Sequence, residues 1–220
     1  MQNLFNWTLF EKLPVIGILR GYSTDQVKKI VQYSEKGGLK NIEITMNSKN
    51  ATDQIMEANE VARDTMNVGA GTVCTLKDLD SALSAGATFI VTPIVNPDVI
   101  QACKKENVPV IPGGFTPTEI YNAWQLGADM VKVFPANRFG PGYIKDIKGP
   151  LSDIKLVVTG GVNLDNFQDY IDYGSYGFGV GSPLFNKERV EAGDWGWVQQ
   201  QAGLFAEIYD KQTLGRKKIT

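Results

Sequence analysis

The stretch Gly127-Ala-Asp-Met-Val-Lys-Val-Phe-Pro135 decides the fold, because related stretches occur at three other places in the chain. Each of them has a glycine that can end a helix, followed by a short apolar run that is typical of a buried strand. The other three begin at Gly38, Gly86 and Gly174. A helix end followed by a buried strand, repeated along the chain, predicts a parallel sheet whose strands are connected by crossover helices.

The number of strand–helix units separates a closed barrel from an open sheet. Eight runs rich in β-branched residues alternate with amphipathic stretches, and we expect strands near residues 14–20, 40–45, 67–72, 88–92, 108–111, 129–133, 155–159 and 175–180. The four related stretches supply every second strand, as the alternating layers of an eightfold barrel favour. The structural alternative is a doubly wound open sheet, but no GxGxxG fingerprint follows the first run.

These observations predict an α/β fold, a (β/α)₈ barrel with a short N-terminal helix, in which residues 1–220 form a single domain. The helix from about Trp195 to Ile208 is expected to close the ring. Lys217 and Lys218 read as a solvated tail. The pair Gly113-Gly114 has no glycine-rich counterpart and is interpreted as a turn.

Composition excludes several classes of function. Hydrophobic residues make up 43% and charged residues 21%, as in ordinary soluble domains, and the net charge of −2 gives no reason to expect a nucleic-acid or membrane partner. The first residues lack the pattern of a signal peptide, and no apolar run reaches the roughly 20 residues of a membrane span. We therefore expect a cytoplasmic protein. Cys74 and Cys103 lie outside any CxxC spacing and are predicted to be buried free thiols.

The chain has no histidine. This excludes a Ser-His-Asp or Cys-His triad and a histidine-ligated metal, and it argues against zinc-dependent catalysis. Acid and base catalysis then falls to a carboxylate, a lysine, a tyrosine or water.

A single lysine, Lys132, interrupts an apolar strand. Strand alternation places it on one face with Met130 and Phe134, whereas Val131 and Val133 face the helices. Lys132 is therefore expected inside the barrel, where burial lowers the pKa of an amine. A neutral amine is the nucleophile that Schiff-base chemistry requires. A structural ion pair or a phosphate anchor explains this feature alone equally well.

The same alternation places Glu43 and Thr45 inside the barrel and Ile42 and Ile44 outside. Strands two and six contribute to the same interior layer, so Glu43 and Lys132 are expected to meet near the axis. A carboxyl group beside an amine can shuttle protons through imine formation and at C3 of a keto acid.

Together these motifs resemble the 2-keto-3-deoxy-6-phosphogluconate (KDPG) aldolases, also called 4-hydroxy-2-oxoglutarate aldolases. The resemblance covers nearly the whole chain and implies a class I aldolase. It implies that Lys132 is the Schiff-base lysine and Glu43 the general acid/base, and that Thr72, Pro93 and Phe134 line the pyruvate pocket. It also implies a homotrimer. The matching segments are Gly17-Ile-Leu-Arg20-Gly21, Glu43-Ile-Thr45, Gly69-Ala-Gly-Thr72-Val, Val91-Thr-Pro93, Val131-Lys132-Val-Phe134-Pro135-Ala136, Gly140-Pro-Gly-Tyr-Ile-Lys145 and Thr159-Gly160-Gly161-Val162.

The chain departs from the family pattern at Asn47. The usual run Glu-x-Thr-Leu-Arg ends in an arginine that helps to hold the keto-acid carboxylate. The amide of Asn47 cannot replace a charged guanidinium group that binds a carboxylate through two N–H donors. Arg20 at the end of strand one is our candidate for the missing positive charge, and we expect it to act together with Thr72. Thr45 and Asn47 stay candidate substrate contacts. The Asn47-Ser48 pair is similar to the 2-keto-3-deoxy-6-phosphogalactonate branch, but that branch typically carries proline where Thr45 stands. The configuration at C4 of the substrate stays open.

Glycine-rich segments follow strands seven and eight, where (β/α)₈ enzymes commonly bind phosphate with loop amides and a short helix N-terminus. Our phosphate-binding candidates are Gly160, Gly161, Gly181 and Ser182. A plain tight turn is the alternative interpretation of these glycines.

The expected reaction is reversible cleavage of a 2-keto-3-deoxy-6-phospho sugar acid to pyruvate and glyceraldehyde 3-phosphate, without a metal or organic cofactor. 4-Hydroxy-2-oxoglutarate is a further candidate substrate. Two alternatives are a phosphosugar isomerase or epimerase on a similar barrel, with Lys132 acting only as an electrophile, and a noncatalytic phosphosugar-binding protein. Reduction with borohydride distinguishes both alternatives from an aldolase, because only an imine is trapped covalently by reduction.

Overall fold

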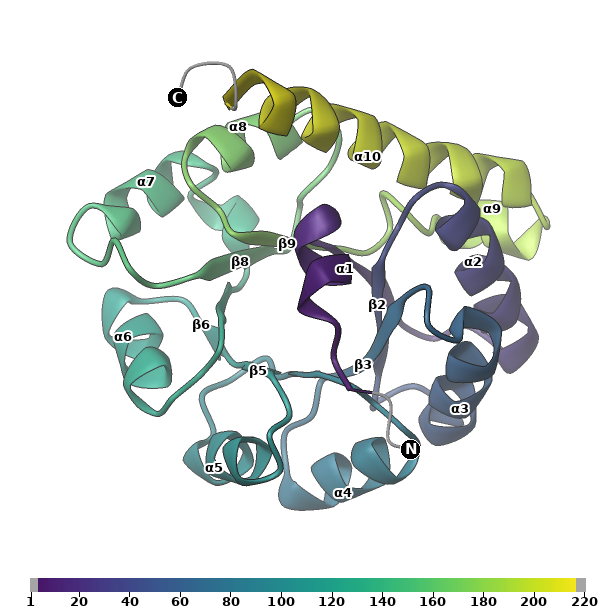
Figure 1. The fold of residues 1–220 in the computed structure, drawn as a ribbon, viewed down its shortest axis with the longest axis horizontal. Coiled ribbons are helices and arrows are strands. Elements are labelled where there is room, and N and C mark those ends of the chain that lie inside the picture. Colours follow the sequence, from purple (N-terminus) through teal and green to yellow (C-terminus); the bar gives the residue numbers. More distant parts are fainter. Residues whose placement is uncertain (1–3, 217–220) are drawn as a thin grey trace.

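The structure is a computed structural model and describes residues 4–216. A ring of parallel strands is surrounded by helices (Figure 1). The strands are β1 (Val15–Leu19), β2 (Asn41–Thr45), β3 (Asn67–Gly71), β4 (Ile90–Val91), β5 (Val110–Ile111), β6 (Gly113–Gly114), β7 (Val131–Val133), β8 (Leu156–Thr159) and β9 (Gly177–Val180). The helices are α1 (Trp7–Lys12), α2 (Thr24–Lys36), α3 (Ala51–Ala62), α4 (Leu76–Ser84), α5 (Pro97–Lys105), α6 (Pro117–Gln125), η1 (Ala136–Arg138), α7 (Gly142–Lys148), α8 (Phe167–Asp172), α9 (Lys187–Glu191) and α10 (Trp195–Arg216).

The strand order β5-β4-β3-β2-β1-β9-β8-β7-β6 forms a ring, because β5 and β6, at its two ends, are joined through Pro112. β5 and β6 are thus two halves of the fifth barrel strand, and the predicted (β/α)₈ barrel with its N-terminal helix is confirmed. All the strand pairs are parallel. None of the helices within residues 4–216 is long and apolar enough to cross a membrane.

The interpretation of Gly113-Gly114 as a turn is wrong. The pair continues the fifth strand and pairs with Lys132 and Val133. Pro112 has no N–H, so the ladder is interrupted there, although its carbonyl still accepts a bond from the Lys132 N–H at 2.8 Å. Glycine is required at position 113 because a Cβ there would lie 2.6 Å from the backbone of Pro93. Gly113 permits the close approach of the Pro93 backbone and Gly114 that of α6, so these glycines serve packing rather than a reversal of the chain.

The glycines that begin the repeated stretches do end helices, as predicted. Gly38, Gly86, Gly127 and Gly174 have φ angles of 97°, 92°, 92° and 88°, in the left-handed region that glycine tolerates best. The residue that follows each of these glycines donates its backbone N–H to the carbonyl of the residue five positions before it, as Leu39 does to Ser34. This is the Schellman closure, and it turns the chain from the end of a helix into the following strand.

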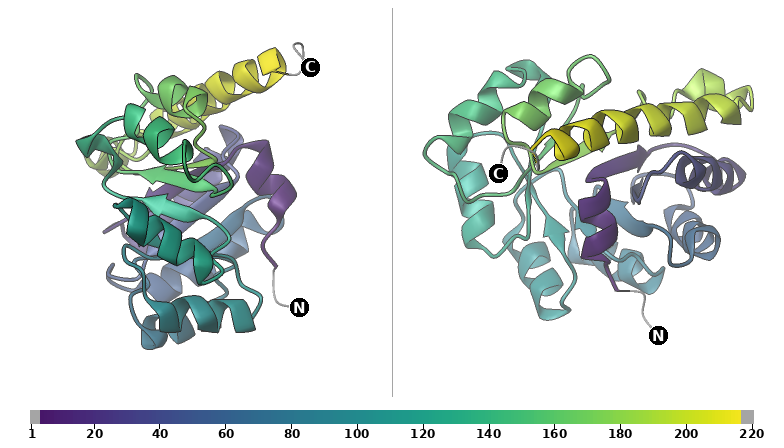
Figure 2. Two further views of the ribbon diagram at one scale, coloured as in Figure 1. Left: turned by 90° about the vertical axis from the view of Figure 1, so that its left-hand side faces the viewer. Right: turned by 45° about the horizontal axis from the view of Figure 1, so that its top comes forward.

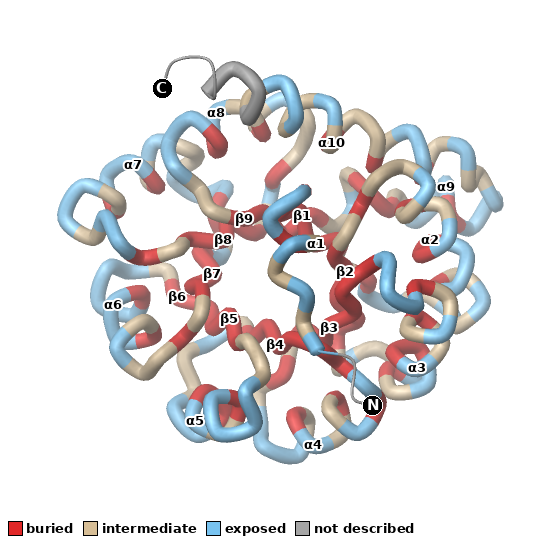
Figure 3. Tube along the Cα trace, viewed as in Figure 1, coloured by how far each residue is buried: buried red, intermediate tan, exposed pale blue. Residues whose placement is uncertain are grey.

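The core has two compartments. An outer layer of buried side chains lies between the strands and the helices, and a smaller cluster fills the barrel itself. Figure 3 shows the ring of strands as almost continuously buried. The interior cluster consists of Phe10, Ile16, Phe89, Val91, Ile111, Met130 and Val157. Ile16, Val91 and Met130 are inward positions of their strands, so the alternation on which the site prediction rests is correct for these strands.

The end of the barrel at which the strands begin is covered by α1 (Figure 2, left). Phe10 of α1 is fully buried in the interior cluster. Asn67 fixes the segment before α1, because it accepts a bond from the Asn6 N–H at 2.8 Å and donates to the Asn6 carbonyl at 2.9 Å. It also donates to Asn41 at 2.8 Å. The opposite end, at which the strands finish, is left for the functional site.

Candidate active site

A cavity of about 520 Å³ lies at the end of the barrel where the strands finish. Its walls come from strand ends and the loops that follow them, as is usual for the catalytic end of a (β/α)₈ barrel. The lining residues are Ile18, Arg20, Glu43, Thr72, Pro93, Lys132, Phe134, Thr159, Gly160, Gly161, Val162, Asn163, Gly179, Gly181, Ser182 and Pro183. Ten of the twelve predicted site residues are among them, all except Thr45 and Asn47.

Lys132 occupies the centre of β7 and is 6% exposed, inside the barrel as predicted. Val131 and Val133 on either side belong to the outer core. Burial lowers the pKa of the Lys132 amine, and the negative charge of Glu43 opposes this shift only in part. The ion pairs among the described residues do not include Lys132. Its Nζ instead lies 4.9 Å from the centre of the Phe134 ring.

Glu43 reaches the same cavity from β2 and is 3% exposed. Burial raises the pKa of its carboxyl group, and the positive charges of Lys132 and Arg20 oppose the shift. The carboxylate lies over Gly71 of β3, where a Cβ would be 2.5 Å from Glu43 Oε1. The absence of a side chain at position 71 therefore creates the space that Glu43 occupies.

Burial shifts the two pKa values towards each other, so that the neutral amine and the neutral carboxyl group are both favoured. Neither group is neutralised by an ion pair within the described part of the chain. A buried amine and a buried carboxyl group that face one cavity without a direct ion pair are free to act on a third molecule. This combination points to a reaction site more strongly than to a structural pair.

Arg20 lies at the mouth of the cavity, directly after β1. Its Nη2 donates to Thr72 Oγ1 at 3.4 Å. Thr72 has φ +56°, a conformation that a β-branched residue rarely adopts and that often marks a functional position. The structure thus brings together the arginine and the threonine that we expected to replace the family's missing arginine.

The other predicted lining residues also meet at the cavity. Pro93 and Phe134 form part of its wall, and Phe134 is 41% exposed. Gly160 and Gly161 follow β8 with φ angles of 96° and 77°. The segment after Ser182 is a turn, and α9 begins only at Lys187, so the short helix expected there is absent among the described residues.

Thr45 and Asn47 lie away from the cavity. Thr45 is fully buried, and its hydroxyl pairs with Ser48 Oγ at 2.9 Å. The chain turns directly after Thr45, where the Ser48 N–H donates to the Thr45 carbonyl, and Asn47 is exposed on this turn. Asn47 was expected at the site because it corresponds to the family's arginine, but β2 ends at Thr45 and Asn47 lies beyond it.

Thr159 and Asn163 line the cavity but were not predicted. Thr159 had a usable signal, because alternation from the interior residue Val157 points it inward and Gly179 on β9 has no side chain to oppose it. Asn163 follows the Gly160-Gly161 turn and has no such periodic signal.

The two cysteines differ from each other. Cys103 is a fully buried free thiol, as predicted, and burial raises its pKa to about 12. The prediction that Cys74 is buried is wrong, because it lies partly exposed on the loop before α4. Residues 4–216 contain no group of three or more histidine, cysteine, aspartate or glutamate side chains arranged to hold a metal ion.

The fold and the site define a (β/α)₈ protein with a buried lysine and a buried glutamate in one cavity at the carboxyl ends of its strands. Residues 8–201 match the family described as KDPG and KHG aldolase. The chain belongs to this family.

Individual relatives cover most of the chain. It is 36% identical to the 2-dehydro-3-deoxy-6-phosphogalactonate aldolase of Escherichia coli, over 90% of this chain and 95% of that relative. It is 32% identical to the 2-dehydro-3-deoxy-phosphogluconate aldolase of Haemophilus influenzae, over 84% of this chain and 87% of the relative. A solved structure described as native KDPGal has a TM-score of 0.85 and 35% identity, covering 92% of this chain and 97% of that one.

Proposed function

We propose that the protein is a class I aldolase that reversibly cleaves a 2-keto-3-deoxy-6-phospho sugar acid to pyruvate and glyceraldehyde 3-phosphate. The observation that carries the proposal is the pair Lys132 and Glu43: both are almost completely buried, both face one cavity, and neither takes part in an ion pair of the described chain. The names of the relatives support the class of substrate.

In the proposed reaction the neutral Lys132 amine attacks the C2 carbonyl and forms a carbinolamine. Loss of water gives a protonated imine. The C3–C4 bond then breaks, its electron pair moves towards the imine nitrogen to form an enamine, and the C4 hydroxyl loses its proton as the aldehyde leaves. Protonation at C3 and hydrolysis of the imine release pyruvate and regenerate the amine.

Glu43 is the proposed proton carrier. A carboxyl group whose pKa is raised by burial can both hold and release a proton closer to neutral pH than an exposed glutamate. Arg20 with Thr72 is proposed to hold the keto-acid carboxylate, and the loops at Gly160-Gly161 and Gly181-Ser182 are proposed to hold the phosphate.

We also propose that residues 1–220 form one domain, that the protein is cytoplasmic and that it assembles as a homotrimer. One strand ring spans the chain from β1 to β9, and α10 packs against α2 and α8, which supports a single domain. A substrate class of phosphorylated metabolites supports the location, and the family resemblance supports the trimer. Sedimentation equilibrium at several protein concentrations tests the trimer directly.

The test of function is reduction with borohydride in the presence of pyruvate. We expect covalent modification of Lys132, identified by mass spectrometry of the digested protein. An unmodified protein contradicts the Schiff-base mechanism. Cleavage of the gluconate and galactonate substrates, assayed side by side on the same preparation together with 4-hydroxy-2-oxoglutarate, then establishes which configuration at C4 is preferred.

A further inference from the structure

Arg20 has little side-chain support of its own. Within residues 4–216, its guanidinium group makes one hydrogen bond, the long bond of 3.4 Å to Thr72. The side chain is on the exposed side of the cavity mouth, where a flexible arginine has many rotamers to choose from. Its direction therefore depends largely on the backbone that carries it, from β1 to the turn at Gly21, whose φ is +74°.

That backbone is fixed by Ser48, a residue of the neighbouring loop. Ser48 Oγ accepts a hydrogen bond from the Gly21 N–H at 3.0 Å. The same hydroxyl pairs with Thr45 Oγ1 at 2.9 Å, and Thr45 is the fully buried last residue of β2. Ser48 thus connects the residue after Arg20 to the strand that carries Glu43.

A second contact joins the same two loops. Gln54 of α3 is 2% exposed, and its Nε2 donates to the Tyr22 carbonyl at 2.8 Å and to the Lys49 carbonyl at 3.0 Å. The β1–α2 and β2–α3 loops are thus joined twice, between Gly21 and Ser48 and, one residue further along each loop, through Gln54. Ser48 contributes the bond nearest to Arg20, yet it is not among the residues that line the cavity.

We propose that Ser48 is a positioning residue for Arg20: by holding the Gly21 N–H, its hydroxyl directs the guanidinium group towards an anion in the cavity. The inference rests on the proposed function in one respect, because that function identifies the anion as a keto acid. It assigns Ser48 an effect on ligand affinity and none on the chemistry carried out by Lys132 and Glu43.

The test compares Ser48→Ala with the parent protein. We expect the Kd for pyruvate, measured by calorimetry, and the KM in pyruvate C3 proton exchange to rise about threefold to tenfold, the usual consequence of losing one hydrogen bond. The exchange rate at saturating pyruvate should change less than about twofold, because binding alone is affected. Ser48→Thr keeps the hydroxyl and should restore the parent affinity. Ser84→Ala, a matched change at an exposed serine of α4, should leave both values unaltered.

A double-mutant cycle separates positioning from general loosening of the loop. In the Arg20→Met background the Ser48→Ala change should have no further effect on the Kd, because the group that Ser48 directs is gone. An equal loss in both backgrounds, or no loss in either, overturns the inference. Ser48→Cys provides a near-isosteric variant that replaces the hydroxyl by a weaker acceptor, should Ser48→Ala fail to fold. The Kd can be measured without turnover. If borohydride traps no imine, the proposed function is contradicted, but the effect of Ser48→Ala on the Kd still tests the positioning role.

Discussion

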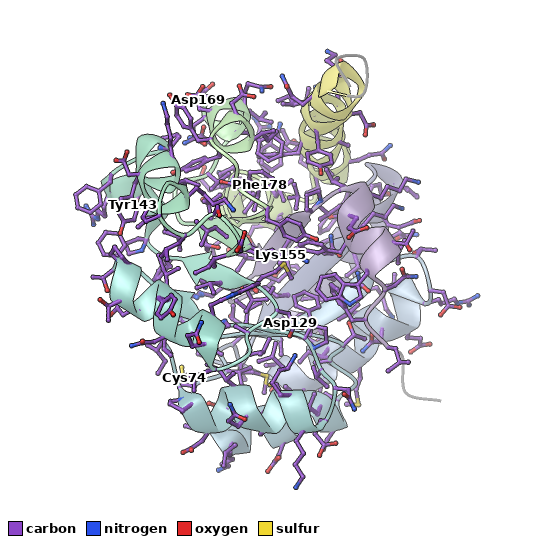
Figure 4. The ribbon with its side chains drawn as sticks, turned by 60° about the vertical axis from the view of Figure 1, so that its left-hand side comes forward. Cys74, Asp129, Tyr143, Lys155, Asp169 and Phe178 are labelled. Carbon is purple, nitrogen blue, oxygen red and sulfur yellow. The ribbon has the colours of Figure 1, made fainter. Side chains whose placement is uncertain are left out.

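The two ends of the barrel use similar residue types in opposite ways. At the end where the strands begin, the amides of Asn41 and Asn67 have hydrogen-bond partners, and the Nζ of Lys155 lies 4.8 Å from the ring centre of Tyr176. At the end where they finish, Lys132 and Glu43 are buried more deeply than Lys155 and have no ion pair within the described chain. In Figure 4, Lys155 lies towards the side covered by α1, and Cys74 and Tyr143 lie towards the opposite side.

The two ends thus differ in how their polar groups are used: at one end they bond to each other and close the barrel, and at the other they face a cavity without an ion pair in the described chain. The functional site is not in the larger of these two cavities. A cavity of about 660 Å³ lies near the strand beginnings, and its lining includes Phe5, Thr88 and Val108. Glu106 is the one charged side chain in its lining. The smaller cavity is lined by Lys132 and Glu43, whose pKa values are shifted by burial, a combination that is typical of functional sites.

The largest expected difference between the two ends is seen when the lysine at each end is replaced by methionine. Lys132→Met should abolish turnover and borohydride trapping with pyruvate, because the proposed nucleophile is gone. Lys155→Met is the matched control and should keep both, since its amine lies over the rings of Trp7 and Tyr176. Trapping that survives in Lys132→Met would refute the assignment of the nucleophile.

The next effect concerns the carboxyl groups. Glu43→Gln should leave a trappable imine but slow pyruvate C3 proton exchange by about a hundredfold or more, the usual contribution of a positioned acid or base. Exchange into deuterated water, followed by NMR, measures it. Glu11→Gln at the opposite end is the control and should exchange at the parent rate, because Glu11 accepts a hydrogen bond from Tyr176 at the end where the strands begin. If Glu43→Gln also exchanges at the parent rate, another group moves the proton.

Arg20→Met is expected to lower kcat/KM for pyruvate exchange by about 1.5–3 kcal/mol, mainly through KM, because a hydrogen bond to a charged group is lost. Arg189→Met on α9, which removes a surface ion pair with Asp194, serves as the control. If Arg20 serves only the phosphate, cleavage of phosphorylated substrates weakens while pyruvate exchange stays at the parent level. Unchanged kinetics in both reactions would leave the carboxylate site without its proposed cation.

At the closed end a change should affect stability instead of rate. Asn67→Ala leaves the Asn6 backbone and Asn41 Oδ1 without their partner, which should cost about 1–3 kcal/mol in the free energy of unfolding. Urea unfolding measures this cost, and kcat/KM of the folded enzyme should equal that of the parent. Asn122→Ala on the exposed face of α6 should leave stability nearly unchanged. A large loss of activity in folded Asn67→Ala would show that the two ends are coupled.

The smallest effect is a slope in stability against pH. Burial lowers the Lys132 pKa below its ordinary 10.5, so the unfolded chain binds more protons than the folded one between the lowered pKa and 10.5. The free energy of unfolding therefore rises with pH in that window, by less than about 1.4 kcal/mol per pH unit. Lys132→Met should lose this rise. The raised pKa of Glu43 has the opposite sign, so Glu43→Gln should remove a fall in stability above pH 4.5. Equal slopes in parent and variants would contradict the burial of these charges.

Much of this architecture could be predicted from periodicity. The eight predicted strands coincide with the observed ones to within a few residues, and inward alternation correctly placed Lys132, Glu43 and Arg20 at one cavity. These predictions succeed because the pleat fixes the direction of a side chain locally, wherever the strand continues.

Prediction failed where contacts between distant residues decide the structure. Gly113 continues a strand because it lies against the Pro93 backbone, a contact that no local pattern reveals. Asn47 corresponds to the family's arginine, but it lies beyond the end of β2, on a turn closed by the Ser48 N–H, and does not reach the cavity. Asn163 reaches the cavity from a loop whose path depends on the Asn166 side chain, which donates to the Gly161 carbonyl at 2.8 Å.

The missing side chain at Gly71, whose place the Glu43 carboxylate takes, has a consequence for which substitutions the sequence can accept. A methyl group at Gly69 would lie 2.5 Å from the ring of Phe89 in the packed interior, so selection for folding alone should reject alanine there. At Gly71 the obstacle is the Glu43 carboxylate, a flexible group that can move aside. A library of variants sorted for solubility should therefore retain alanine at 71 and lose it at 69, whereas a library sorted for growth on the substrate should lose it at both. If alanine at position 71 is retained in the first library and lost in the second, glycine is needed there for activity and not for folding.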